Sequence, residues 1–515
     1  MIPVLGSRQM RAADAAAIRS GTPSRTLMEN AASALVEETL ASFPDWRRVV
    51  VVCGPGNNGG DGLAAARLLR ESGLSVLLFC LNDPSELRKD AAVNLALARD
   101  AGLEPSSLAS RSGFRGLAEA LRDADGVVDA LFGTGLSRAL TGRAARAVEA
   151  IEAAARPVVA ADVPSGLSAD TGALPGPSVR AALTVAFAAP KLCHVFPPAR
   201  SRCGRVVVRD IGIPAAALSR SKSRARLVEK EDVARLFPAR RLDANKSDFG
   251  RLAVIAGSRG KAGAAVLAAR GALRAGAGLV TIFCPEAIES VAVDALPEAM
   301  THALPDRGGA LAPEAAGLLR RALEGFDAAV VGPGLSTEGG VVEVLRALLR
   351  LRMPLVCDAD ALNAFAGEPG AFARRAPTVL TPHPGEAGRL LSKTSGEVQA
   401  DRLAAASELA ARTRCVVVLK GEGTLTATPA GRVSVNPTGT PLLATAGSGD
   451  VLAGVVGALL ASGLAPEDAA IASVYLHGAA AERLARRLGD AGLLASELAD
   501  ALPEARLALR GEPLP

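Results

Sequence analysis

Short runs of β-branched and apolar residues alternate along the chain with longer stretches rich in alanine and leucine, which carry charged residues at helical spacing. This alternation is typical of βα units built around a parallel sheet. In the first half we expect the strands Val49–Cys53, Ser75–Cys80, Gly126–Leu131, Pro157–Ala161, Leu183–Phe187 and Val206–Ile211. In the second half we expect the strands Leu252–Ala256, Leu279–Cys284, Ala328–Val331, Leu355–Cys357, Thr378–Leu380, Cys415–Lys420 and Leu425–Ala427.

A basic, serine-rich segment, Ile213–Leu227, separates the two series and has few large apolar residues, as expected of an exposed linker. A chain of 515 residues is long enough for at least two domains. No fixed-period repeat relates the halves. The pattern therefore predicts two different α/β domains, residues 1–215 and residues 227–515.

The composition narrows the class of protein. With 49% apolar and 22% charged residues, the chain has the material for a buried core and does not resemble a disordered protein. A net charge of +5 and only 3% aromatic residues argue against nucleic acid as a partner. The seven cysteines form no C-x-x-C pair, which indicates buried thiols in a reducing compartment.

Neither a signal peptide nor a membrane span is expected. The start of the chain lacks the apolar region of a signal peptide. The best candidate for a membrane span, the uncharged segment Val451–Pro466, is shorter than the roughly 20 residues that a spanning helix needs. We therefore expect a soluble cytoplasmic protein with no membrane partner.

The first chemical signal is the sequence GPGNNGGDG, Gly54–Gly62, directly after the expected strand Val49–Cys53. Glycines let the backbone approach a ligand, and amides at a helix N-terminus attract anions. A plain strand-to-helix turn would need only one or two glycines, whereas this loop adds the polar residues Asn57, Asn58 and Asp61. We therefore favour a ligand-binding loop over a tight turn.

Two further loops follow expected strands and should open at the same edge of the sheet, where ligands bind in open α/β folds. They contain Asp129 with Gly133–Arg138, and Asp162 with Ser165. Carboxylates, hydroxyls and carbonyls suit a hard cation better than a soft metal. Either aspartate alone is better explained as a helix N-cap, but three converging loops favour a binding site.

These motifs, together with LMENAA (Leu27–Ala32) and APK (Ala189–Lys191), resemble the NAD(P)H-hydrate epimerase domain in their order along the first half. The resemblance implies a Rossmann-like fold, a bound potassium ion and the interconversion of the R and S forms of hydrated NADH or NADPH. It implies potassium ligands at Asn58, Asp129 and Ser165, with Asp162 as the candidate acid/base. Residues implied to contact the hydrated nucleotide are Asn57, Asn58, Gly59, Gly60, Asp61, Gly133, Thr134, Gly135, Leu136, Ser137, Arg138, Ala139 and Asp162.

In the second half, LLATAGSGDVLAG (Leu442–Gly454) places glycines and Asp450 before an apolar helix. No Walker A motif is present, so free amides at this helix start are the candidate anion hole for a phosphoryl group. Asp450 is then placed to accept a hydroxyl proton as that hydroxyl attacks phosphorus. Taken alone it is equally a capping aspartate on a glycine-rich turn. His383, between two prolines after an expected strand, is expected to face a ligand.

With CDADALN, TPHPGE and LKGEGT, this half resembles the ribokinase-like ADP-dependent NAD(P)H-hydrate dehydratase. The resemblance implies that ADP, with Mg²⁺, phosphorylates the hydrate hydroxyl and that phosphate then leaves, giving NAD(P)H and AMP. Residues implied to bind the hydrated substrate are Ala264, Gly334, His383 and Asp450. Residues implied to bind the adenine nucleotide are Lys420, Gly421, Glu422, Gly423, Thr424 and Gly449.

Two alternatives remain at this point. One is a ribokinase-like vitamin or sugar kinase fused to a non-catalytic nucleotide-binding module. The other, a nicotinamide dehydrogenase, rests only on the G-x-G-x-x-G at Gly54, Gly56 and Gly59. A fused pair of repair activities is chemically sensible, because a dehydratase that consumes one epimer needs an epimerase for the other. We further expect a homo-oligomer.

Overall fold

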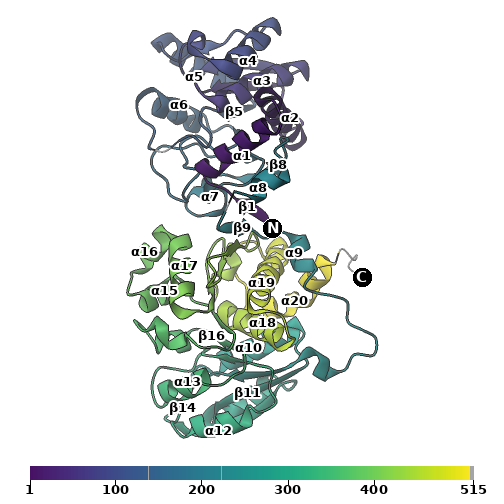
Figure 1. Cartoon of the computed structure of the whole chain (residues 1–515), viewed down its shortest axis with the longest axis vertical. Coiled ribbons are helices and arrows are strands. Elements are labelled where there is room, and N and C mark those ends of the chain that lie inside the picture. Colours follow the sequence, from purple (N-terminus) through teal and green to yellow (C-terminus); the bar gives the residue numbers. More distant parts are fainter. Residues whose placement is uncertain (137, 222, 511–515) are drawn as a thin grey trace. The chain divides into compact units, whose positions relative to one another are not determined.

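The computed structural model describes residues 1–136, 138–221 and 223–510 (Figure 1). It divides into an N-terminal unit, Ile2–Arg226, and a C-terminal unit that runs from Leu227 and includes Met1. Each unit holds its own mainly parallel sheet with helices around it, so the α/β fold class is confirmed. No described helix combines the length and the apolar character that a membrane crossing requires.

The sheet of the N-terminal unit is parallel throughout, in the order β4-β3-β2-β5-β6-β7-β8. Its first long strand, β2, pairs with β3 on one side and with β5 on the other, so the strand order reverses there. The strands of this unit are β1 (Ile2–Val4), β2 (Arg48–Cys53), β3 (Ser75–Cys80), β4 (Ser106–Ser107), β5 (Gly126–Ala130), β6 (Val158–Ala161), β7 (Leu183–Phe187) and β8 (Arg205–Arg209), followed by β9 (Ala225–Leu227) at the boundary.

Helices cover both faces of this sheet because alternate residues of a buried strand point to opposite sides. Val49 and Val51 of β2 pack in one core with α2, α3 and α4, whereas Val50 and Val52 pack in another with α5 and α6. The helices are α1 (Ser7–Arg19), α2 (Ser24–Ser42), α3 (Asn57–Glu71), α4 (Lys89–Asp100), α5 (Arg111–Asp123), α6 (Gly142–Ala153), α7 (Leu192–Val195) and α8 (Ala215–Ser219).

The sheet of the C-terminal unit runs in the order β20-β19-β18-β17-β16-β15-β10-β11-β12 and is parallel except for β19, which is antiparallel to both β18 and β20. Strand β10 pairs with β11 and β15, which makes a second point of reversal. The strands are β10 (Arg251–Ile255), β11 (Leu279–Pro285), β12 (Met300–Leu304), β15 (Ala328–Val331), β16 (Leu355–Cys357), β17 (Thr378–Leu380), β18 (Val416–Leu419), β19 (Leu425–Ala427) and β20 (Val433–Val435), with a separate hairpin of β13 (Asp306–Arg307) and β14 (Ala310–Leu311).

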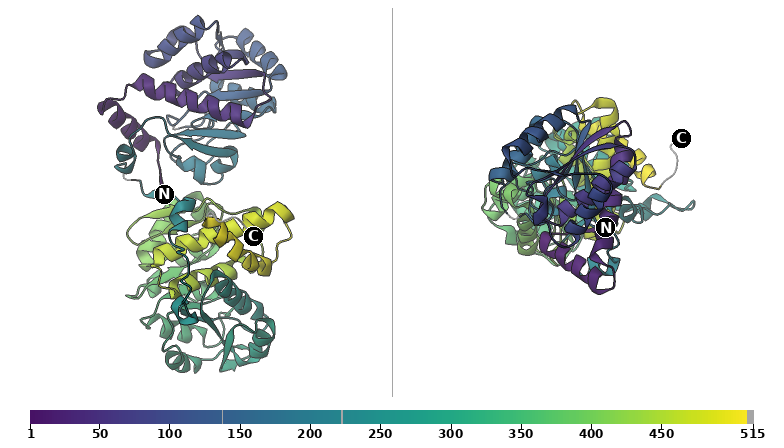
Figure 2. Two further views of the ribbon diagram at one scale, coloured as in Figure 1. Left: turned by 90° about the vertical axis from the view of Figure 1, so that its right-hand side faces the viewer. Right: turned by 90° about the horizontal axis from the view of Figure 1, so that it is seen from above.

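Four of the helices of this unit, α10, α18, α19 and α20, pack against one another over a core that includes Leu252 and Val254 of β10. The last three are the yellow helices in Figure 2. The helices are α9 (Lys230–Ala234), α10 (Ala262–Ala275), α11 (Glu289–Ala295), α12 (Ala315–Ala322), α13 (Val341–Leu349), α14 (Asp360–Asn363), α15 (Pro384–Leu391), α16 (Ser395–Ala400), α17 (Arg402–Thr413), α18 (Ser448–Ala461), α19 (Pro466–Leu488) and α20 (Ala495–Leu509).

Helices α10 and α18 approach so closely that glycine is required at their contact. A Cβ on Gly454 of α18 would lie 1.9 Å from the carbonyl oxygen of Ala268 in α10, and a Cβ on Gly271 would lie 2.6 Å from the carbonyl oxygen of Val451. Both distances are too short for any side chain. The two helices therefore touch backbone to backbone.

The segment Ile213–Leu227 is not the plain exposed linker that its composition predicts. It contains the short helix α8 and the strand β9, and it buries Ile213 and Ala225. The segment is therefore packed at both ends, although the serines and arginines between them are polar.

Candidate active sites

Three loops of the N-terminal unit meet at the edge where the strand order reverses. The loop after β2 contacts the loop after β5, because a Cβ on Gly54 would lie only 1.7 Å from the carbonyl oxygen of Leu131. The loop after β5 contacts the loop after β6, because the backbone N–H of Phe132 donates to Ser165 Oγ at 2.9 Å. The predicted convergence of these loops on one edge is therefore observed, at the position where open α/β sheets bind ligands.

Asp129 and Ser165 form a buried oxygen-rich cluster within these loops. Ser165 donates to Asp129 through its hydroxyl at 2.6 Å and through its backbone N–H at 2.8 Å. Burial raises the pKa of Asp129 to about 6, although the hydrogen bonds from Ser165 oppose the shift. The side chain of Asn58 lies against Gly133, and its buried Nδ2 has no hydrogen-bond partner among the described residues.

Asp162 sits directly after β6 in the left-handed region, with φ of +64°, and is mostly buried. Lys191, which is fully buried, donates its Nζ to Asp162 Oδ1 and to the carbonyl oxygen of Phe187 at 2.8 Å. The backbone N–H of Phe187 donates to the same Asp162 oxygen at 3.0 Å. These contacts hold the Asp162 carboxylate in one place.

Two more carboxyl groups surround this ion pair. Burial, followed by the charge of Asp162, raises the pKa of Asp61 well above its usual value and that of Asp14 to about 6. Asp61 is 9% exposed. Asp61 and Asp14 thus feel both charges of the ion pair, and their raised pKa values favour the neutral acid form of each.

The remaining predicted contacts of this unit lie around the three loops. Asn57, Asn58, Gly59 and Gly60 form the start of α3. In the loop after β5, Gly133, Thr134, Leu136 and Ala139 are half-buried, whereas Gly135 and Arg138 are exposed. Ser137 lies outside the described residues.

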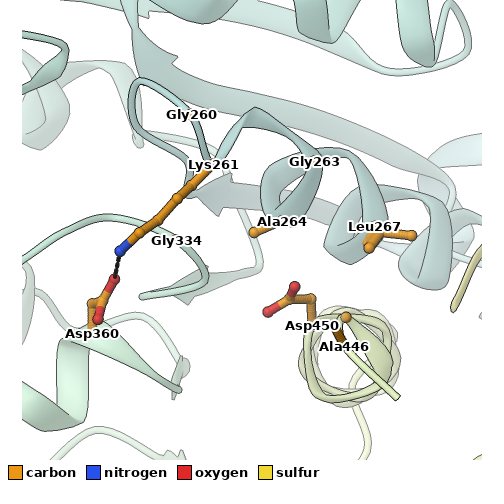
Figure 3. A pocket seen from close by; sticks show the side chains of 10 residues that line it. Gly260, Lys261, Gly263, Ala264, Leu267, Gly334, Asp360, Ala446 and Asp450 are labelled. Carbon is orange, nitrogen blue, oxygen red and sulfur yellow. Dashed lines mark hydrogen bonds and ion pairs between the residues drawn. The ribbon is translucent and has the colours of Figure 1, made fainter.

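The C-terminal unit has a cavity of about 470 Å³ at its own point of strand reversal (Figure 3). The loop after β10, the loop after β15 and the start of α18 contribute its walls. Three of the predicted substrate residues, Ala264, Gly334 and Asp450, line it together. Its lining consists of Gly260, Lys261, Gly263, Ala264, Leu267, Gly334, Asp360, Ala446, Gly447 and Asp450.

Asp450 lies in the first turn of α18 and turns its carboxylate into this cavity (Figure 3). Burial, followed by repulsion from Asp358, raises its pKa to about 7. A carboxyl group with that pKa is ionised half the time near neutrality, which suits a general base.

A buried charge network lies beside Asp450. Lys420 Nζ donates to Asp358 Oδ1 at 2.8 Å and lies 3.8 Å from Glu386 Oε2. Thr381 Oγ1 also donates to Asp358 Oδ1, at 2.8 Å. Burial lowers the pKa of Lys420, but the two carboxylates outweigh it and the net shift is upward. Lys420 is therefore positively charged at neutral pH.

Lys420 also connects the predicted nucleotide loop to α18. A Cβ on Gly449 would lie 3.4 Å from Lys420 Nζ, so the amine lies beside the backbone at the helix start. Gly421–Thr424 completes the turn between β18 and β19 and is closed by a hydrogen bond from Thr424 Oγ1 to the carbonyl oxygen of Gly421 at 2.7 Å. The structure thus brings together Lys420 and Gly449, two of the residues that the resemblance implies to bind the adenine nucleotide.

His383 occupies a different place from the other predicted substrate residues. It caps α15, accepting a hydrogen bond at Nδ1 from the backbone N–H of Gly385 at 2.9 Å. Its side chain is 49% exposed and lies 3.4 Å from Glu386. It does not line the cavity that Asp450 faces, so whether it contacts substrate stays a prediction.

Sequence reasoning assigned no role to Asp358, Asp360, Glu386 or Lys191. Asp358 and Lys191 could have been suspected, because each directly follows a strand or its turn within a motif already noted. The pairings could not be predicted, because Asp358 contacts Lys420, 62 residues away, and Lys191 contacts Asp162, 29 residues away. Among the described residues, no three His, Cys, Asp or Glu side chains are grouped to hold a metal ion.

Comparisons with known families agree with the predictions made for the two halves of the chain. The family described as YjeF-related protein N-terminus matches residues 24–193, and the family described as NAD(P)H-hydrate dehydratase matches residues 252–504. A protein of Moorella thermoacetica named bifunctional NAD(P)H-hydrate repair enzyme Nnr is 42% identical over 487 residues, covering 93% of this chain and 92% of that protein.

The protein of the same name from Escherichia coli is 37% identical over 472 residues, covering 92% of this chain and 87% of that protein. Among solved structures, the ADP/ATP-dependent NAD(P)H-hydrate dehydratase of Bacillus subtilis, co-crystallised with ATP and Mg²⁺, is 34% identical with a TM-score of 0.47. The match covers 55% of this chain and 97% of that one.

Proposed function

The chain belongs to the family of bifunctional NAD(P)H-hydrate repair enzymes, and from that premise we propose how its two units perform the epimerase and dehydratase reactions. Residues 1–215 form the epimerase domain and residues 227–515 the dehydratase domain. The substrates are hydrated NADH or NADPH and, for dehydration, ADP. A vitamin or sugar kinase is not favoured, because relatives named as repair enzymes match nearly the whole chain.

In the epimerase unit, Asp162 is the group that moves a proton at the epimerised carbon. Lys191 supports this role, because its buried side chain donates to the Asp162 carboxylate and holds it in one orientation. Asp61, with its raised pKa, is suited to remain protonated beside it. A proton donor next to a proton acceptor would allow one carboxyl group to act as acid and the other as base.

Potassium is proposed to bind at Asp129, Ser165 and Asn58. The donor set fits a hard cation, because all three residues offer oxygen. The side chain of Asn58, whose amide lacks a hydrogen-bond partner among the described residues, is free to turn its oxygen toward an ion. When bound, the ion would supply positive charge that orders the three loops.

In the dehydratase unit, the hydroxyl oxygen of the hydrated ring attacks the β-phosphorus of ADP while Asp450 accepts the hydroxyl proton. The bond from that phosphorus to the bridging oxygen breaks, and AMP leaves. The phosphate on the ring then departs with its bonding electron pair, a neighbouring carbon loses a proton, and the double bond of NAD(P)H forms. The observation that supports this assignment is the cavity that Asp450 shares with Ala264 and Gly334.

Lys420 and the start of α18 stabilise the phosphoryl group during transfer. The Lys420 ammonium and the free amides at the helix N-terminus present positive charge at one place. Mg²⁺ usually binds through one or two carboxylates plus substrate phosphates, and Asp358 and Glu386 beside Lys420 fit that pattern. When bound, Mg²⁺ would neutralise phosphate charge.

We also propose a cytoplasmic location, which the seven free and buried cysteines support. Homo-oligomerisation and the lack of nucleic-acid or membrane partners stay predictions.

The assay is the return of reduced-nicotinamide absorbance when the full chain is mixed with hydrated NADH, ADP and Mg²⁺. We expect complete recovery from a mixture of R and S epimers. A parallel incubation with pyridoxal or hydroxymethylpyrimidine and ATP should give no phosphorylated product. Phosphorylation of those compounds without recovery of NADH would favour the kinase alternative.

A further inference from the structure

Lys261 places a cation on the wall of the dehydratase cavity opposite Asp450. It directly precedes α10, and its side chain runs along the cavity toward Asp360 (Figure 3). Its Nζ lies 3.3 Å from Asp360 Oδ2. No step of the proposed chemistry uses this lysine.

Asp360 is a fixed anchor for Lys261. Its Oδ2 also accepts the backbone N–H of Ser336 at 2.9 Å, and its side chain is only 17% exposed. Lys261, by contrast, is 53% exposed and uses one of its three N–H donors. An exposed ion pair at this distance adds little to the stability of the fold. Stability therefore does not account for the pairing of Lys261 with Asp360.

The cavity wall around Lys261 leaves space for a ligand group. Added Cβ atoms on Gly260 and Gly263 would meet nothing within 4 Å. Asp450 is the group that meets the reacting hydroxyl, so the ring of the hydrated substrate lies at the other end of the cavity. A dinucleotide extends from that ring through its ribose to a diphosphate, which carries two negative charges.

We propose that Lys261 forms an anion subsite that binds the diphosphate of the hydrated dinucleotide while Asp360 holds its ammonium in place. This inference rests on the proposed dehydratase function. ADP is not the ligand of this subsite, because its phosphates are proposed to lie between Lys420 and Asp450, whereas Lys261 lies on the wall opposite Asp450. Lys261 can donate to a phosphate without leaving Asp360, since two N–H donors remain.

The test compares the full chain with its Lys261→Gln and Lys261→Arg variants in ADP-dependent dehydration. We expect Lys261→Gln to raise KM for hydrated NADH about tenfold, the size of one charge-assisted hydrogen bond at a partly exposed position. The kcat and the KM for ADP should stay within about twofold. Lys261→Arg should recover most of the loss, since it keeps the charge.

Arg259→Gln is the matched control, because Arg259 is an exposed cation of the same loop that does not line the cavity. Its KM for hydrated NADH should equal that of the unchanged protein. In addition, KM should rise with salt for the unchanged protein and stay nearly flat for Lys261→Gln.

An unchanged KM in Lys261→Gln, or an equal rise in Arg259→Gln, would overturn the subsite. So would a loss confined to kcat or to the KM for ADP. These results differ from failure of the proposed function, in which the unchanged protein itself shows no ADP-dependent recovery of NADH.

Discussion

Lys191 is fully buried, and its ammonium group donates to the carboxylate of Asp162, the candidate acid/base of the epimerase unit. The pair joins the turn after β7 to the end of β6, and Phe187 holds both partners through its backbone. A charge this deeply buried is stable only with its partner present. The two residues therefore act as one unit, in which neither can change alone without cost.

Replacing Lys191 by methionine should stop epimerisation and destabilise the N-terminal unit. Removing one partner of a buried ion pair leaves an unpaired charge, which typically costs about 3–5 kcal/mol. Thermal unfolding and loss of the R epimer are the two measurements. In the double variant Lys191→Met with Asp162→Asn, stability should largely return, whereas epimerisation should not. Full epimerase activity in Lys191→Met would contradict the assignment.

Potassium should distinguish Asp129 from Asp162. Asp129→Ala should weaken epimerisation and its response to potassium, because it removes a proposed ligand. Asp162→Asn should abolish epimerisation even at saturating potassium, and asparagine suits the left-handed backbone at this position. A potassium titration that follows the R epimer checks both. A normal potassium response in Asp129→Ala would restore a purely structural role for that aspartate.

Asp450→Asn should slow dehydration by roughly a hundredfold or more, the scale of removing a general base. Epimerisation should continue, since its proposed residues lie in the other unit. The measurement is the initial rate of NADH recovery from the pure S epimer. Near-normal dehydration would remove Asp450 from the mechanism.

The pH dependence of dehydration should report Asp450. Its pKa is raised to about 7, so the ionised form predominates above that pH. Only this form can accept a proton. The rate should therefore fall as pH drops through about 7 and level off above it. The same shift means that ionising Asp450 disfavours folding, so unfolding of Asp450→Asn should occur at a higher temperature than that of the unchanged protein at pH 8. A flat rate profile would point to another base.

Chelation of divalent cations by EDTA should abolish ADP-dependent dehydration and leave epimerisation intact. The phosphates need Mg²⁺ charge that Lys420 alone does not supply. Readdition of Mg²⁺ should restore the rate. Turnover with ATP but none with ADP would count against the proposed donor.

The strands that the sequence predicts best are the buried ones. The structure has strands with the predicted bounds at Ser75–Cys80, Leu183–Phe187 and Ala328–Val331. A strand whose two faces are both covered needs a continuous apolar run, and such a run is easy to recognise. Strand β12, Met300–Leu304, escaped prediction because it lies at the sheet edge and its exposed residues interrupt the apolar run. Edge position is decided by strand order, which local patterns do not encode.

Candidate sites divide in the same way. Asp129 was predictable because it lies at the end of β5, where parallel strands meet at one edge, and Asp450 because it follows glycines at the start of an apolar helix. Asp358 also directly follows a strand, but its role could not be predicted, because that role depends on Thr381 and Lys420, which follow β17 and β18. Chemistry visible in a motif can be predicted, whereas chemistry created by pairing distant strands requires the fold.

The glycine contact between α10 and α18 fixes the width of the dehydratase cavity. Ala264 and Asp450, on opposite walls, are carried by two helices that meet backbone to backbone at Gly454 and Ala268. No side-chain rotation can move these walls apart, and no trimming of a side chain at the contact can widen the gap. The fixed spacing of the two helices therefore limits the size of the substrate ring. A redesign for a larger ring would have to move a whole helix.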